Sequence, residues 1–190
     1  MALPIRYLCG IALGTQEGDV VLNLFVLDAE GDKVPVYVSA ATPDDLRATA
    51  KWQTQWTSKA ALEMPNKVAL RRTGTNELLG LMAYIVDGRS LAVEIVYVES
   101  ADHSNTNLLR VEGRPKKYIG IAKALFAYAV SVSIENGYDG VLVFKAKTSE
   151  LVAYYIREFG ASHAGSYDPF RLVIWEDAAQ LLIKDFEGSD

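Results

Sequence analysis

Apolar and polar residues alternate in several short runs along the first half of the chain, which is the pattern of half-buried strands. Turns rich in Gly, Asp and Asn separate the runs, so we expect an antiparallel meander. The strands that this pattern predicts are Ile5–Leu13, Val20–Asp28, Val34–Ser39, Lys67–Arg72, Glu77–Val86 and Leu91–Ser100.

A helical segment interrupts these strands. Thr42 is placed to cap a helix, Pro43 follows at its first position, and two acidic residues stand in its first turn. We therefore expect helix, in one or two pieces, as far as Glu63. Trp52 and Trp56 are four residues apart and would share one helical face, as part of the core or as a lid over it.

The second half of the chain changes to a helical period. Apolar residues recur at steps of three and four after residue 118, which predicts a helix lying on the sheet. The expected order is helix Tyr118–Asn136, strand Val141–Ala146, helix Ser149–Phe159 and strand Arg171–Glu176. Together the two halves predict an α/β fold, with a mixed, largely antiparallel central sheet and helices on both faces.

Composition adds limits to this picture. The chain has 190 residues, of which 50% are hydrophobic and 23% charged, and no linker divides it, so we expect one domain over residues 1–190. The single cysteine, Cys9, excludes an internal disulfide, and two histidines are too few for a metal cluster, so we expect no metal. The short apolar start is interrupted by Arg6, which argues against a signal peptide or membrane anchor and favours a cytoplasmic protein.

The turn before the predicted helix at residue 118 carries the strongest chemical signal. The first N–H groups of a helix lack intrahelical partners and bind anions. Gly120 lets the backbone approach a ligand, and Ala122 keeps the next position small. Three cations surround the same turn, namely Lys116, Lys117 and Lys123. This combination predicts a pyrophosphate site. The positive charge is local, and the net charge of −5 for the whole chain argues against general nucleic-acid binding.

The spacing of Lys117, Gly120 and Ala122 resembles the Gln/Arg-x-x-Gly-x-Gly/Ala signature of the Gcn5-related N-acetyltransferase (GNAT) superfamily. In that family the loop holds the diphosphate of coenzyme A. The order of the predicted elements is similar too, as are the segments 135–148 and 154–161. The resemblance covers residues 77–176, an acetyl-CoA-binding core, and leaves residues 1–76 as a divergent part.

The resemblance implies an enzyme that transfers an acetyl group from acetyl-CoA to a primary amine, directly and in a ternary complex. Backbone groups near Val96 and Val98 would align the pantetheine arm of the cosubstrate. The diphosphate would be held by the residues of the loop, which are Lys117, Tyr118, Ile119, Gly120, Ile121, Ala122 and Lys123.

Candidate acid–base residues follow from the chemistry of acetyl transfer. Glu94 and Glu99 face opposite sides of a regular strand unless a bulge intervenes, and we favour Glu99 as the base because it sits where the strand opens toward the loop. His103 is a second candidate, as a base or a substrate-binding side chain. Tyr155 is our candidate acid, although the position that matches the family's tyrosine is Ile156.

The sequence is compatible with several alternatives. The Ile156 departure is compatible with a catalytically silent acyl-CoA-binding or protein-interaction module of the same fold. The resemblance implies a small-molecule or peptide amine as the acceptor, and the basic run Arg110–Lys123 leaves aminoacyl-tRNA as a further option. The long stretch Ala101–Lys116 is expected to be a loop, either over the acceptor site or an idle insertion. A homodimer would be compatible with the family.

Overall fold

The computed structural model describes residues 22–187, which form an eight-stranded sheet in the order β1-β2-β3-β4-β5-β6-β8-β7. Every neighbouring pair is antiparallel except β5 and β6, which are parallel. The mixed, largely antiparallel sheet that we predicted is therefore confirmed. Its strands are β1 (Phe25–Leu27), β2 (Lys33–Ala40), β3 (Asn66–Arg72), β4 (Leu78–Asp87), β5 (Ala92–Ser100), β6 (Leu142–Lys145), β7 (Ser162–His163) and β8 (Arg171–Ile174).

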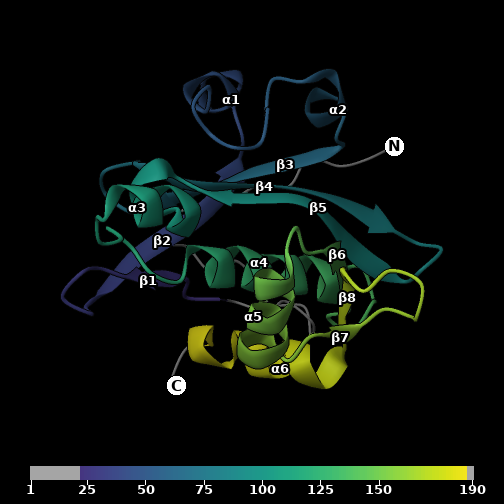
Figure 1. Ribbon diagram of the computed structural model, residues 1–190. Helices are drawn as coiled ribbons and strands as arrows, with labels where there is room; N and C mark the ends of the chain where they lie inside the picture. The colour runs from purple at the N-terminus through teal and green to yellow at the C-terminus, as the bar shows by residue number, and fades with distance from the viewer. Residues whose placement is uncertain (1–21, 188–190) are drawn as a thin grey trace, which may run out of the picture.

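Helices cover both faces of this sheet, as Figure 1 shows. Two short helices lie on one face, and three longer ones lie on the other. The helices are α1 (Pro43–Ala48), α2 (Lys59–Leu62), α3 (Thr106–Glu112), α4 (Ile121–Glu135), α5 (Ser149–Phe159) and α6 (Glu176–Ile183), with short 3-10 turns η1 (Asp102–Ser104) and η2 (Lys184–Phe186). The predicted strand Ile5–Leu13 and Cys9 lie outside the described residues.

Helix α4 is the centre of the larger core. We predicted one apolar face on the sheet, but the helix is buried nearly all round, because α5 and α6 cover its outer side. Phe126 shows this arrangement, since its ring contacts Phe144 of the sheet and Tyr155 and Phe159 of α5. A helix in this position has little freedom to move, so its N-terminus is a fixed point of the fold.

The predicted start of α1 is confirmed, and it is tied to the sheet. Thr42 Oγ1 accepts a hydrogen bond from the Asp45 N–H (3.2 Å), and the Asp45 carboxylate accepts one from the Thr42 N–H (2.7 Å). Both oxygens of Asp45 also accept from Arg71 of β3 at 2.6 Å. Burial alone would raise the pKa of Asp45, but these bonds hold the pKa below its ordinary value.

Our prediction that Trp52 and Trp56 share a helical face is wrong. Helix α1 ends at Ala48 and α2 begins at Lys59, so both tryptophans lie in the irregular segment between them. Trp56 is still a core residue, because it is only 1% exposed and its ring centroid lies 6.0 Å from that of Tyr97.

Three other boundaries differ from the sequence prediction. The stretch Ala101–Lys116 contains η1 and α3 and is not one long loop. Helix α4 begins at Ile121 because Ile119 forms a bridge with Leu27, with N···O distances of 2.8 and 2.9 Å. Strand β8 stops at Ile174, and the chain continues into α6, which we did not predict.

No helix within residues 22–187 combines the length and the apolar character that crossing a membrane requires.

Gly80 allows α4 to approach the sheet, and this predicts a stability effect. A Cβ atom at Gly80 would lie 2.8 Å from Ile121 Cγ2 and 3.0 Å from the Glu99 backbone oxygen. We expect Gly80→Ala to destabilise the protein by about 1–3 kcal/mol. The control is Gly88→Ala, where a Cβ meets only the Tyr138 hydroxyl at 3.3 Å. Equal urea midpoints for the two variants would contradict the prediction.

Candidate active site

A gap opens within the sheet where β5 and β6 separate. The two strands pair only from Val93↔Leu142 to Ile95↔Phe144, although β5 continues to Ser100. The Ala101 N–H donates to the Leu79 oxygen on the β4 side (2.8 Å). Because backbone groups alternate along a strand, the N–H groups of Val98 and Ser100 point the other way, into the gap. An extended ligand can therefore pair with this free edge.

A bulge changes which side chains of β5 share a face. Ala83 pairs with Tyr97 and Tyr84 pairs with Ile95, so Val96 is an extra residue. The five steps along the chain from Glu94 to Glu99 then count as four regular ones, because their partners Ile85 and Leu81 are four residues apart on β4. In a regular strand these two carboxylates would lie on opposite faces, and the bulge brings them to the same face of the sheet.

Glu99 is buried at the end of β5 and holds a distant part of the chain. Its carboxylate accepts hydrogen bonds from the Gln53 N–H (2.7 Å) and the Thr54 N–H (2.9 Å), and the side-chain amide of Asn105 lies 3.5 Å away. The irregular segment between α1 and α2 is thereby anchored over β5. Glu94 is more accessible, and it pairs with Arg171 at 3.4 Å.

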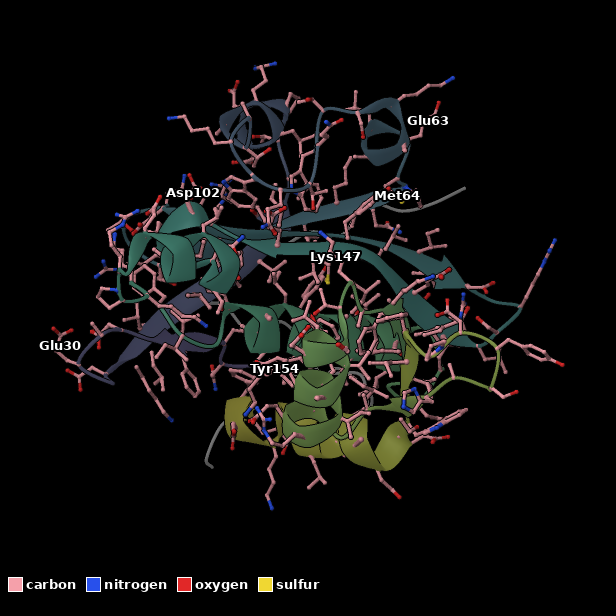
Figure 2. All side chains as sticks on the ribbon, in the orientation of Figure 1. Glu30, Glu63, Met64, Asp102, Lys147 and Tyr154 are labelled. Carbon is pink, nitrogen blue, oxygen red and sulfur yellow. The ribbon has the colours of Figure 1, made fainter. Side chains whose placement is uncertain are left out.

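The other side of the gap is formed by the loop after β6. Lys147 lies in this loop, and its Nζ atom is 3.5 Å from Thr54 Oγ1. In Figure 2 Lys147 lies at the level of the sheet, above α5. A side chain from the β6 side therefore reaches the segment that Glu99 anchors from the β5 side.

The N-terminus of α4 is suited to bind an anion. Gly120 is its N-cap, with φ +95°, and a Cβ at this position would meet no atom within 4 Å. The first bond of the helix runs from the Ala124 N–H to the Gly120 oxygen (2.9 Å). The N–H groups of Ile121, Ala122 and Lys123 thus have no intrahelical acceptor, and they add to the positive end of the helix dipole.

The preceding part of the predicted loop is occupied by the protein itself. The N–H groups of Lys117, Tyr118 and Ile119 donate to the His103 oxygen (2.8 Å), Ser104 Oγ (3.0 Å) and the Leu27 oxygen (2.8 Å). These bonds hold the turn in place. The N–H groups open to a ligand are therefore those from Gly120 to Lys123.

His103 belongs to a polar cluster beside this turn. Its Nδ1 lies 2.7 Å from Ser104 Oγ, and its Nε2 is 3.4 Å from Glu77 Oε1, a distance and orientation that give attraction without a hydrogen bond. Glu77 also binds Lys117 Nζ (2.6 Å) and the Tyr118 hydroxyl (3.2 Å). Burial lowers the pKa of His103, against an opposing effect of Glu77, so the imidazole is neutral at pH 7.

An open hollow of about 460 Å³ lies next to this cluster, with Trp52, Glu77, Asp102, His103 and Arg114 among its lining residues. His103 and Trp52 both line this hollow, and Trp52 belongs to the segment that Glu99 anchors. The residues 22–187 contain no group of three or more His, Cys, Asp or Glu side chains arranged to hold a metal ion.

Tyr155 lies in the aromatic core under the sheet. It is 8% exposed, and its ring contacts Phe126, Phe144 and Phe159. Burial raises the pKa of Tyr155 to about 12, so its hydroxyl stays protonated at neutral pH. Ile156, at the position of the family's tyrosine, is 40% exposed. The acid role of Tyr155 stays a prediction.

The anchoring role of Glu99 predicts an effect on stability. We expect Glu99→Gln to lower the free energy of unfolding by about 1–3 kcal/mol. The amide has one accepting oxygen where the carboxylate has two, so one of the two N–H groups would lose its acceptor. Glu94→Gln is the matched control and should lose less than about 1 kcal/mol, since its ion pair is solvent-exposed. Urea unfolding measures both changes. Equal losses would show that Glu99 does not anchor the segment.

The lowered pKa of His103 predicts a loss of stability in weak acid. Below its ordinary pKa of about 6.5, the unfolded chain binds the proton more readily than the folded chain does. The free energy of unfolding should therefore fall between about pH 6.5 and the folded pKa, and stay lower beneath it. Urea titrations at about pH 7 and about pH 5 should show a smaller fall for His103→Gln. Identical falls in both proteins would contradict this.

This protein is similar to known proteins in its structure and not detectably in its sequence. No protein-family model matches the sequence, and no curated protein matches it either. An acetyltransferase of the GNAT family from Listeria monocytogenes superposes with a TM-score of 0.51 at 15% identity, over 78% of this chain and 97% of that one.

Two further structures match more weakly. Ard1 from Thermoplasma volcanium superposes with a TM-score of 0.44 at 12% identity, over 73% of this chain and 93% of that one. AtaTR bound with AcCoA superposes with a TM-score of 0.48 at 14% identity, over 77% of this chain and 97% of that one. At these identities the likeness to the Listeria protein concerns the fold. The described chain therefore has the fold of the GNAT acetyltransferases.

Proposed function

We propose that this protein is an N-acetyltransferase that moves an acetyl group from acetyl-CoA to a primary amine, by direct transfer in a ternary complex. The observation that carries the proposal is the β5–β6 gap, which has free strand N–H groups along its edge and the open α4 N-terminus at the same end of the sheet. The GNAT fold supports it by analogy.

The cosubstrate would lie along this gap. The N–H groups from Gly120 to Lys123 would hold the diphosphate, where the helix dipole favours negative charge. The edge of β5, from the bulge at Val96 to Val98 and Ser100, would pair with the amides of the pantetheine arm. A strand N–H would also stabilise the oxygen of the thioester as negative charge develops there.

The base must take a proton from the acceptor amine. We keep Glu99 in this role, acting through a water molecule, because its Oε2 atom retains a lone pair beyond the one backbone bond that it accepts from Thr54. Glu94 is the alternative, since the bulge brings it to the same face and it is more accessible. His103 lies farther along the chain in the lining of the hollow, where a neutral imidazole can accept a proton or contact the acceptor.

Tyr155 would return a proton to the departing thiolate. Its raised pKa, about 12, keeps the hydroxyl protonated at neutral pH, as a proton donor must be. The rival proposal is a catalytically silent acyl-CoA-binding or protein-interaction module. It is favoured by the packing of the Tyr155 ring among three phenylalanines and by the adjacent Ile156, whose side chain has no proton to donate.

The basic run Arg110–Lys123 gives little support to a tRNA acceptor. Several of its cations are neutralised within the protein, since Lys117 pairs with Glu77 (2.6 Å), Lys123 pairs with Asp185 (2.6 Å), and Arg114 pairs with Glu112. A small-molecule or peptide amine therefore stays our proposed acceptor.

Calorimetric titration with acetyl-CoA tests the proposal. We expect micromolar binding to the wild-type protein and none to Gly120→Glu, because the added carboxylate would stand in the open space before α4 and repel the diphosphate. Gly120→Ala is the matched control, since it imposes the same backbone strain without the charge. Circular dichroism checks that both variants fold.

The outcomes separate the alternatives. Absence of binding to the folded wild-type protein would refute the acetyltransferase proposal. Binding that Gly120→Glu retains would place the diphosphate elsewhere. Binding without release of coenzyme A across a panel of amines would favour the silent module.

A further inference from the structure

We propose that the protein acetylates its own Lys147, so that this side chain is an internal acceptor at the active site. The inference rests on the proposed function and adds to it a modification site. Two observations carry it, namely the position of Lys147 across the β5–β6 gap and its lack of an ionic partner among residues 22–187.

The position follows from the pairing of the strands. Phe144 is the last residue of β6 that pairs with β5, and Lys147 follows three residues later, so it lies beside the unpaired part of β5. Its Nζ is 3.5 Å from Thr54 Oγ1, and the Thr54 N–H is bonded to Glu99 Oε2 at 2.9 Å. One residue, Thr54, therefore contacts both the amine and the proposed base. Figure 2 shows Lys147 at the level of the sheet.

The neighbouring cations are held differently. Lys145 forms an ion pair with Asp168 at 2.7 Å, and Arg171 forms one with Glu94 at 3.4 Å. Lys147 has no carboxylate partner among residues 22–187, and its contact with Thr54 is at the limit of hydrogen-bond length. Unlike Lys145 and Arg171, Lys147 can therefore leave its contact without breaking an ion pair within the described residues.

The reaction is an ordinary aminolysis of a thioester. The ammonium group of Lys147 loses a proton to the base, and the neutral nitrogen then attacks the carbonyl carbon of acetyl-CoA. A C–N bond forms and the C–S bond breaks. The nitrogen gives up a second proton, and the thiolate leaves and takes one up as coenzyme A. Overall, lysine ammonium and acetyl-CoA give acetyl-lysine, coenzyme A and one proton.

The product would occupy the acceptor side of the gap. Acetylation removes the positive charge of Lys147 and lengthens the side chain by an acetyl group. We therefore expect the modified protein to transfer acetyl groups to added amines more slowly than the unmodified protein, because its own product blocks their approach.

The test is mass spectrometry of the full-length protein incubated with acetyl-CoA and no added amine. We expect one added acetyl group, mapped by peptide analysis to Lys147, at a rate that does not depend on protein concentration. Lys147→Arg should lose the modification, whereas the matched variant Lys145→Arg, which alters an exposed lysine two residues away, should keep it. Lys147 should react faster than Lys145 by on the order of tenfold or more, because its amine is positioned and the other is not.

Reaction with free acetyl-CoA in solution gives a different result. Such chemistry would modify exposed lysines without preference and would continue in Gly120→Glu, so either finding would overturn the inference. Acetyl-CoA binding without modification of Lys147 would also overturn it, while leaving the proposed function intact. Absence of acetyl-CoA binding in the calorimeter would refute both, so the two failures are distinguishable.

Discussion

The separation of β5 from β6 is the constraint on which the rest of the structure depends. Pairing ends at Ile95↔Phe144, and beyond it one edge of β5 has no partner strand within the described chain. Unpaired backbone groups inside a sheet are costly unless something else satisfies them. The bulge at Val96 marks the same point, because an extra residue changes the direction and twist of the strand. The bulge and the end of strand pairing thus occur at the same place, and a ligand that pairs with the free edge would satisfy its backbone groups.

The elements around the gap are held by a few strong contacts. Below the sheet, α4 is enclosed by β4, β5 and α6, so its N-terminus cannot move independently. Above it, the segment between α1 and α2 has little regular structure. It is held in place by the buried side chain of Trp56 and by Glu99, whose carboxylate accepts hydrogen bonds from two N–H groups of the segment. A buried carboxylate with its hydrogen bonds satisfied stabilises one arrangement, because any shift would leave charge unpaired.

The same residues carry structural and proposed chemical roles. Glu99 anchors a segment and is the proposed base, and Lys117 pairs with Glu77 beside the proposed diphosphate site. Tyr155 is part of an aromatic core and the proposed acid. Substitution of such a residue therefore changes packing and chemistry together.

The sequence by itself determined the order of the long strands and of helices α4 and α5, the cap at Thr42 and the glycine turn before α4. These features depend on neighbouring residues, whose periodicity and turn chemistry are local. It nominated candidate residues such as Glu99, His103 and Tyr155, but not their contacts. Only the tertiary structure decided that Glu94 and Glu99 share a face, that Glu99 binds Gln53 and Thr54, and that Lys147 meets Thr54. Each of these depends on a bulge or on chain segments more than forty residues apart, and no local pattern records such pairings.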